Sequence, residues 1–228
     1  MLELPFTVRL PRIVASPTER TTAATDVLLA VQSFAYAADL LRRARTPQVD
    51  QGKATLWAIA FANAGTGAML GAIAHGLEMS PRTNQRIWQP LRLSLSLAVA
   101  FFVTGTLYDT VSAAVARRGL PFMLGGAVVF WLAVPVAQDS FWPFTLYQGA
   151  GMLVALGGYG QQALRTQDAA ALWMLAGVIL SGVAGAVQAT PDLHITAIWE
   201  FDANGLYHLI QSAGLAAIQR GVTCSLAE

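Results

Sequence analysis

The stretch ATLWAIAFANAGTGAMLGAIAHGL, residues 54–77, decides the fold class of this chain. It is long enough to cross the hydrocarbon core of a bilayer, which takes about 20 helical residues. Its only ionisable side chain is that of His75, close to its end. A soluble helix of this length would turn a charged face toward water. The stretch therefore predicts a membrane-spanning helix.

The composition of the whole chain agrees with this interpretation. Of the 228 residues, 55% are hydrophobic and 12% are charged, whereas about a quarter of the residues of a soluble domain are charged. The charges fall in short clusters that long uncharged stretches separate. The net charge is +1, and no basic stripe with interleaved aromatic residues is present, so the sequence does not predict nucleic-acid binding.

Six further stretches are long and apolar enough to predict spanning helices. The expected spans are residues 22–41, 54–77, 91–116, 120–137, 142–164, 169–189 and 198–218. The connections are short and carry proline or charge. We therefore expect an all-α polytopic membrane protein in which residues 1–228 form one domain, a bundle of seven transmembrane helices. Because residues 22–41 are the weakest candidate, six spans are the alternative.

Lysine and arginine residues predict the orientation, because cytoplasmic connections carry an excess of them. With seven spans, eight lie on the side of the C-terminus, namely Arg42, Arg43, Arg45, Lys53, Arg117, Arg118, Arg165 and Arg220. Six lie on the other side, namely Arg9, Arg12, Arg20, Arg82, Arg86 and Arg92. The excess predicts an outside N-terminus and a cytoplasmic C-terminus. The many alanines and arginines suggest a bacterial genome, and hence the inner (plasma) membrane.

Small residues indicate where the helices meet. Gly177, Ser181 and Gly185 recur every fourth residue within residues 169–189. Such small-xxx-small faces let two helix backbones approach closely in a membrane. We expect this face to pack against a neighbouring helix.

Three ionisable residues far apart in sequence are expected at one level of the membrane. His75 ends the second span, Arg92 begins the third, and Asp202 begins the seventh, all on the expected outer side. An ionisable group at the centre of a membrane costs on the order of 3 kcal/mol and usually faces the bundle interior. We therefore expect a polar cavity that opens outward between the second, third and seventh spans.

The seventh span adds a polar face to this cavity. Asn204 and His208 are four residues apart, and Gln211 and Ser212 extend the same face. Such a face should look into the bundle rather than toward lipid. The expected pocket residues are Arg92, Asn204, Gln211 and Ser212.

Asp109 lies toward the opposite, cytoplasmic side of the third span, beside Tyr108. Two interpretations stay open for it. It is either an interior acid held by hydrogen bonds or a proton carrier.

Two segments resemble motifs of the alkaline ceramidase and progestin/adipoQ receptor superfamily of seven-helix membrane hydrolases. They are GAIAHGL at residues 71–77 and NGLYHLIQSAG at residues 204–214. In that superfamily helix two carries Ser-xxx-His, helix three an Asp and helix seven His-xxx-His. Three histidines hold a zinc ion whose water attacks a lipid amide. The resemblance implies that His75 and His208 are metal ligands.

The other motif positions differ from the family pattern, being occupied by Gly71, Asn204 and Arg92. A catalytic zinc usually has three protein ligands and a water. Two histidines therefore need a third ligand, for which the candidates are Glu78, Asp202 and His194.

Three functions are compatible with these residues. The first is a ceramidase-like hydrolase of a lipid amide or ester, in which His75 and His208 hold zinc and Asp202 or Asp109 acts as the catalytic acid or base. The second is a metal-free pocket for membrane lipid or a small amphiphile, in a receptor or accessory protein, where Arg92 meets an anionic headgroup. The third is a transporter with Asp109 and His208 as proton relays. A retinal pigment is disfavoured because the seventh span has no lysine.

Overall fold

The computed structural model describes residues 11–136, 142–190 and 192–227. These residues form seven α-helices and one short hairpin. The bounds are α1 Pro17–Arg43, α2 Gln51–Gly76, α3 Pro81–Thr110, α4 Ala113–Val136, α5 Trp142–Thr166, α6 Ala169–Gln188, β1 Ile195–Thr196, β2 Glu200–Phe201 and α7 Ala203–Ser225. The all-helical fold is confirmed. Within the described ranges, α1, α2, α3, α4 and α6 are long and apolar enough to cross a membrane.

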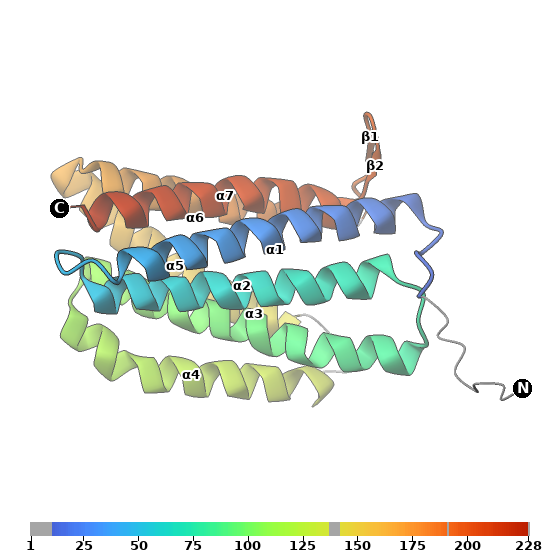
Figure 1. Ribbon diagram of the computed structural model, residues 1–228, viewed down its shortest axis with the longest axis horizontal. Helices are drawn as coiled ribbons and strands as arrows, with labels where there is room; N and C mark the ends of the chain where they lie inside the picture. The colour runs from blue at the N-terminus through green and yellow to red at the C-terminus, as the bar shows by residue number, and fades with distance from the viewer. Residues whose placement is uncertain (1–10, 137–141, 191, 228) are drawn as a thin grey trace, which may run out of the picture.

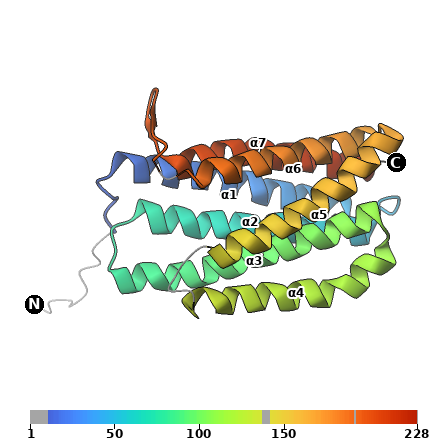
Figure 2. The ribbon, with the colours of Figure 1, turned by 180° about the vertical axis from the view of Figure 1, so that it is seen from behind.

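The helices form one elongated bundle with two ends (Figure 1). We call one end the hairpin end, because it carries β1 and β2 beside the starts of α1, α3 and α7. The opposite end, which carries the starts of α2 and α6 and the end of α7, is named the Lys53 end. α1 packs between α2 and α7, α3 packs on α2, α4 and α5, and α6 packs on α5 and α7 (Figure 2).

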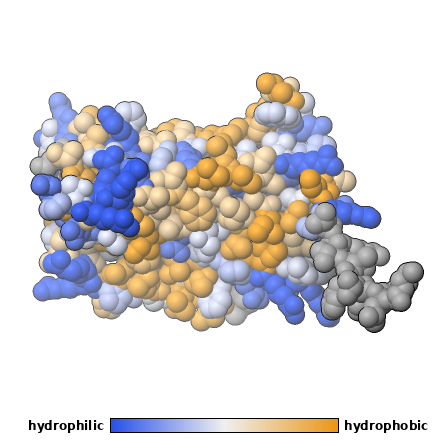
Figure 3. Space-filling model, viewed as in Figure 1, coloured by the Kyte–Doolittle hydropathy of each residue, from blue (hydrophilic) through white to orange (hydrophobic). Residues whose placement is uncertain are grey.

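On the face seen in Figure 3, apolar side chains form a belt across the middle of the bundle, and polar side chains gather at both ends. Large hydrophobic side chains are exposed on several helices, such as Val31 of α1, Leu153 of α5 and Ile179 of α6, which are 60%, 71% and 50% exposed. A contiguous apolar surface of this kind is typical of a membrane or protein contact. The belt and the long apolar helices fit an integral membrane protein.

The boundary between α3 and α4 differs from the expected one. A single span was expected to continue to residue 116, but α3 ends at Thr110 and α4 begins at Ala113. Ser112 explains the early start of α4, because its hydroxyl accepts a hydrogen bond from the Val115 N–H at 3.2 Å as an N-cap serine does. Pro121 lies inside α4.

The start of the last helix also differs. Residues 198–202 were expected to be helical, but Ile195 pairs with Phe201 and Thr196 with Glu200 in an antiparallel hairpin. Helix α7 begins after Asp202, whose carboxylate accepts the Gly205 N–H at 2.8 Å. Asp202 is therefore the N-cap of α7 rather than a residue within the span.

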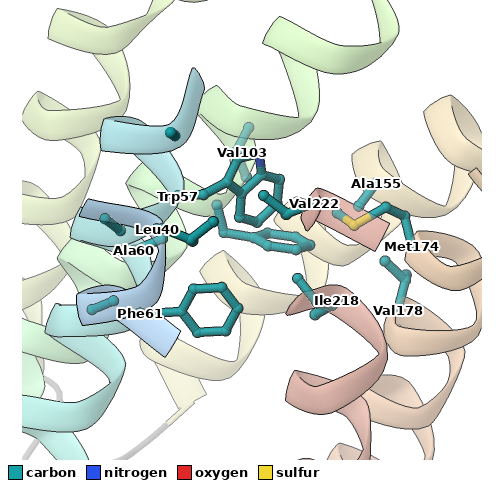
Figure 4. Packing of buried hydrophobic residues seen from close by; sticks show 14 of the residues in the cluster. Leu40, Trp57, Ala60, Phe61, Val103, Ala155, Met174, Val178, Ile218 and Val222 are labelled. Carbon is teal, nitrogen blue, oxygen red and sulfur yellow. The ribbon is translucent and has the colours of Figure 1, made fainter. Parts of the chain in front are cut away.

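The buried core joins six of the helices. Figure 4 shows Trp57 and Phe61 of α2 packed among Leu40 of α1 and Ile218 and Val222 of α7. Further members of the same cluster come from α3, α5 and α6. This core fills the middle of the bundle, and the two cavities described below lie toward its ends.

Helices α6 and α7 approach closely through small residues. A methyl group added at Gly177 would lie 2.5 Å from Ile218 Cγ1 and 2.9 Å from the Gly214 carbonyl oxygen. A methyl group at Gly214 would lie 2.9 Å from Ser181 Oγ. The expected contact face is thus confirmed at Gly177 and Ser181, whereas Gly185 meets open space.

Replacing Gly177 by alanine should lower the free energy of unfolding by about 1–3 kcal/mol, because the added methyl overpacks the α6–α7 contact. The matched control Gly185→Ala should leave stability unchanged or raise it by up to about 1 kcal/mol, since alanine has the higher helix propensity. Thermal unfolding in detergent micelles, followed by circular dichroism, measures both. Similar midpoints for the two variants would contradict this contact.

Candidate functional site

His75 lies in the last turn of α2 and ties three helices together at the hairpin end. Its Nδ1 is 2.7 Å from Glu19 Oε2 of α1. The indole of Trp88 in α3 stands edge-on to the imidazole, with 5.6 Å between the ring centres. On α3 the guanidinium carbon of Arg92 is 5.9 Å from the centre of the Trp88 ring. His75 therefore belongs to a polar and aromatic cluster at the polar edge of the bundle.

A cavity opens beside this cluster. This hairpin-end cavity has a volume of about 480 Å³. It is lined by Val14, Glu19, Ala74, His75, Leu77, Glu78, Met79, Asn84 and Trp88. The segment before α1 forms one wall, because the Val14 N–H donates to the Gly76 carbonyl at 3.0 Å and the Glu78 N–H donates to the Arg12 carbonyl at 2.8 Å. The cavity thus lies among α1, α2 and α3.

His208 of α7 is buried deeper and is held by two consecutive residues of α1. Its Nδ1 is 3.0 Å from Thr25 Oγ1, and its Nε2 is 3.3 Å from Asp26 Oδ1. The exposed fractions of His208, Thr25 and Asp26 are 8%, 7% and 4%. Gly71 of α2 leaves room for this carboxyl group, because a methyl added there would lie 2.8 Å from Asp26 Oδ2. At the position where the resemblance places a serine, this chain therefore accommodates an aspartate of α1.

Asp202 joins the same network from the start of α7. Its Oδ1 accepts a hydrogen bond from the Thr22 hydroxyl of α1 at 2.9 Å as well as the capping bond from Gly205. The carboxylate expected to act as a catalytic acid or base thus caps a helix and anchors it to α1.

The two imidazoles are held by different turns of α1. Glu19 and Asp26 are seven residues apart, which is about 10 Å along a helix axis. Histidine ligands lie about 2.0–2.1 Å from a zinc ion. Within the described part of the chain, no group of three His, Cys, Asp or Glu residues could hold a metal ion. Each imidazole is thus paired with its own residue of α1, and the zinc site that the resemblance implies stays a prediction.

The polar face of α7 is divided between two neighbours. The Gln211 amide donates to Ser181 Oγ of α6 at 3.1 Å, whereas the Ser212 hydroxyl donates to Gln32 Oε1 of α1 at 2.6 Å. Asn204 Oδ1 accepts from the Gln188 amide of α6 at 3.2 Å. The face does look into the bundle, where it joins α7 to α6 and α1.

The cavity differs in place from the expected one. We expected it between the second, third and seventh helices, but α1 lies between α2 and α7, and no α7 residue lines the hairpin-end cavity. Arg92 is only 9% exposed and is not among the lining residues. Of the expected site residues, His75 lines the cavity. Glu78, which was expected only as a candidate third zinc ligand, lines it too.

Asp109 lies near the opposite end of the bundle in a buried ion pair. Its Oδ1 is 2.9 Å from Lys53 Nζ of α2, and the two side chains are 7% and 12% exposed. Its Oδ2 accepts hydrogen bonds from the Tyr159 hydroxyl of α5 at 2.8 Å and from Trp57 Nε1 at 3.3 Å. The expectation of a hydrogen-bonded interior acid agrees with these contacts. Asp109 and His208 lie at opposite ends and do not form one site.

A second cavity borders this ion pair. The Lys53 cavity has a volume of about 200 Å³. It is lined by Lys53, Asp109, Tyr159, Gln162, Asp168, Ala170, Ala171, Met174 and Ser225.

Asp50 lies at the Lys53 end of the bundle as the N-cap of α2. Its carboxylate accepts hydrogen bonds from the Lys53 N–H at 3.0 Å and the Tyr108 hydroxyl at 2.7 Å. Partial burial raises the pKa of Asp50, but the hydrogen bonds from Lys53, Tyr108 and Gly52 outweigh it and hold that pKa below its ordinary value. Asp50 therefore stays ionised at neutral pH and fixes the start of α2.

One family of known sequences matches most of the chain, including residues at both ends of the bundle. Residues 21–226 match a family described as "Family of unknown function (DUF6962)". The chain belongs to this family. The DUF6962 match includes His75, His208 and the Lys53–Asp109 pair, and it leaves Glu19 outside. No curated protein and no solved structure matches the chain. The family description assigns no activity, so the likeness to the ceramidase superfamily stays a prediction.

Proposed function

We propose that this DUF6962 protein binds an amphiphile with a cationic headgroup in the hairpin-end cavity, without a metal. The observation that supports it is the composition of the cavity wall, which brings two carboxylate side chains and an imidazole together with apolar side chains. A cavity of about 480 Å³ is within the range of roughly 300–1,000 Å³ usual for small-molecule sites.

The charge of the wall selects the headgroup. Glu19 and Glu78 line the cavity, and among the residues that the structure describes no lysine or arginine does. Opposite charges attract most where water is partly displaced, so a primary or quaternary ammonium is favoured over a phosphate or carboxylate. This assignment reverses the sign expected from Arg92, whose guanidinium lies near Trp88 rather than in the cavity wall.

The other lining side chains suit an acyl or alkyl chain. Val14, Leu77, Met79 and Trp88 contribute an apolar surface, and burying each methylene of a tail contributes about 0.8 kcal/mol. A ligand that is charged at one end and apolar at the other satisfies both parts of the wall. A membrane lipid with an ammonium head and a free amphiphile share this chemistry.

In this proposal all seven helices span a bacterial plasma membrane, with the hairpin end and the N-terminus outside. The excess of basic residues on the other side supports this orientation. The cavity then opens at the outer boundary of the apolar belt, where an amphiphile enters with its tail toward the membrane.

The contacts of the two histidines favour binding over ceramidase-like hydrolysis. Glu19 engages His75, and Thr25 and Asp26 engage both ring nitrogens of His208. His208 does not line the cavity, so a substrate in this cavity would meet one imidazole rather than two. His75 is then a hydrogen-bonding group of the binding site that keeps the Glu19 carboxylate in place.

Octylammonium should bind the purified protein in phosphatidylcholine nanodiscs, with empty nanodiscs as the blank, in isothermal titration calorimetry. The double variant Glu19→Gln with Glu78→Gln should bind it at least tenfold more weakly, since both counter-charges are lost. The matched control is Glu200→Gln, which removes an exposed carboxylate of β2 at the same end and should bind as the parent protein does.

Two further probes separate the contributions of charge and tail. Octanoate carries the same tail with a negative head and should not compete, and methylammonium lacks the tail and should bind far more weakly. Equal binding of octylammonium and octanoate, or an unchanged affinity in the double variant, would rule out the proposed headgroup site.

A further inference from the structure

We infer that the Lys53 cavity is a second binding site, for a small zwitterion that carries one ammonium and one carboxylate group, such as a free α-amino acid. The site lies at the opposite end of the bundle from the hairpin-end cavity and does not depend on the proposed function. It is built where the starts of α2 and α6 meet the ends of α3, α5 and α7.

Charges of both signs line this cavity. Lys53 contributes an ammonium, and Asp109 and Asp168 contribute carboxylates. Lys53 and Asp109 neutralise each other at 2.9 Å. Asp168 caps α6 by accepting the Ala170 N–H at 2.8 Å, so the partial positive charge of the helix N-terminus, roughly half an elementary charge, offsets part of its own. The wall is therefore nearly neutral overall but strongly polar at each side.

Such a wall disfavours ions that carry one charge only. A simple cation attracted by Asp168 also meets the Lys53 ammonium, and a simple anion attracted by Lys53 also meets the two carboxylates. Each such ion thus has a repulsive contact beside its attractive one, in a site partly removed from water. A zwitterion places its carboxylate toward Lys53 and its ammonium toward Asp168, and its net charge matches that of the nearly neutral wall.

Gln162 supplies an independent observation that points to a donor on the ligand. This side chain of α5 lines the cavity, and its Oε1 atom is buried without a hydrogen-bond partner in the described structure. An unpaired buried acceptor is destabilising, and an ammonium N–H of the ligand removes that cost. The carboxylate of Asp168 and the amide oxygen of Gln162 thus form an acceptor pair for the ammonium end.

The volume limits the ligand to a small one. About 200 Å³ is roughly seven times the share of liquid volume of one water molecule. An amino acid with a short side chain fits this space. The apolar part of the wall, Ala170, Ala171 and Met174, is suited to a methyl or ethyl side chain rather than to another charge.

Calorimetric titration of the detergent-solubilised full chain with L-alanine tests the site. Ethylammonium and propionate are the matched probes, because each keeps the carbon skeleton and one of the two charges. Alanine should bind at least tenfold more tightly than either. Asp168→Asn, which keeps an N-capping side chain, and Gln162→Met should each weaken alanine binding about tenfold. Asp192→Asn, an exposed position at the hairpin end, is the control and should not.

Each alternative outcome overturns the assignment. Ethylammonium binding as tightly as alanine would make this a cation site, and propionate binding as tightly would make it an anion site. If the protein is folded, as judged by circular dichroism, and none of the three probes binds, the cavity is not a site for small zwitterions. The double variant Glu19→Gln with Glu78→Gln should bind alanine normally, so failure here is distinguishable from failure at the hairpin end.

Discussion

Replacing Lys53 by methionine should lower the free energy of unfolding by about 3–5 kcal/mol, the largest loss we expect from one substitution. The change leaves Asp109 as a buried charge without its partner, and breaking a buried pair from one side costs this much. The side chain of Asp109 is 7% exposed, so the carboxylate left without its partner stays largely removed from water.

A second substitution should restore most of the loss. Asparagine at position 109 carries no charge but still offers an oxygen to the Tyr159 hydroxyl and the Trp57 N–H. Lys53→Met with Asp109→Asn should therefore recover more than half of the stability, because both charges are gone and the hydrogen bonds keep an acceptor. Asp109→Asn alone should lie between the two.

Thermal unfolding in a mild detergent, or unfolding by added dodecyl sulfate, gives the comparison. Arg45→Met is the control, because Arg45 is exposed in the α1–α2 connection and its loss should change stability by less than about 0.5 kcal/mol. A Lys53→Met protein as stable as the control, or a double variant no more stable than the single one, would show that the pair carries no such energy.

The helices could be predicted because a membrane sets their length and their surface. Residues 54–77 and 169–189 were expected as spans, and α2 and α6 agree with them within a few residues. The helix ends were harder to predict, because short polar side chains set them locally. Ser112 starts α4 and Asp202 starts α7, and neither residue interrupts an apolar run enough to be read as a boundary.

The polar network around His208 was only half predictable. The face of α7 that carries His208 was expected to look inward, but its partners on α1 were not identified. They are Thr22, Thr25, Asp26 and Gln32. Asp26 and Asp39, near the two ends of residues 22–41, make this stretch the weakest candidate span. The sequence does hold a signal for this network, because two apolar helices each carry a polar stripe. The side chains of one stripe supply hydrogen-bond partners to those of the other inside the bundle.

The sequence does not predict the role of Lys53, because its position is typical of a charge that only sets the orientation of a spanning helix. It immediately precedes the apolar run that begins at residue 54, where basic residues usually face water or headgroups. Its position four residues before Trp57 places both on one face of α2, and both side chains reach Asp109. Which helix that face meets depends on the rotation of α2 against α3 and α5, which one sequence does not determine.

Replacing His208 by alanine should lower the free energy of unfolding by about 3 kcal/mol. Part of the loss is the cavity left by a side chain that is 8% exposed. The rest comes from Asp26 and Thr25, which lose the imidazole nitrogens that they contact. The packing of Asp26 against Gly71 leaves little room for water to replace the imidazole.

A double-mutant cycle separates these two parts. If His208 and Asp26 stabilise each other, His208→Ala in the Asp26→Ala background should cost about 1 kcal/mol or more less than it does in the parent protein. His194→Ala is the matched control, because His194 is exposed beside the hairpin and should have no effect. Additive losses would mean that the imidazole only fills space.

The same variants test the zinc site that the resemblance to the ceramidase superfamily implies. If both histidines held a zinc ion, the bound metal would stabilise the folded protein by mass action. A chelator would then lower the unfolding midpoint of the parent protein and leave that of His208→Ala unchanged. From the pairing of each imidazole with α1 we expect the parent midpoint to be the same with and without chelator. A chelator-sensitive midpoint that disappears on replacing either His75 or His208 would instead mean that both rings turn away from Glu19 and Asp26 to share one metal ion.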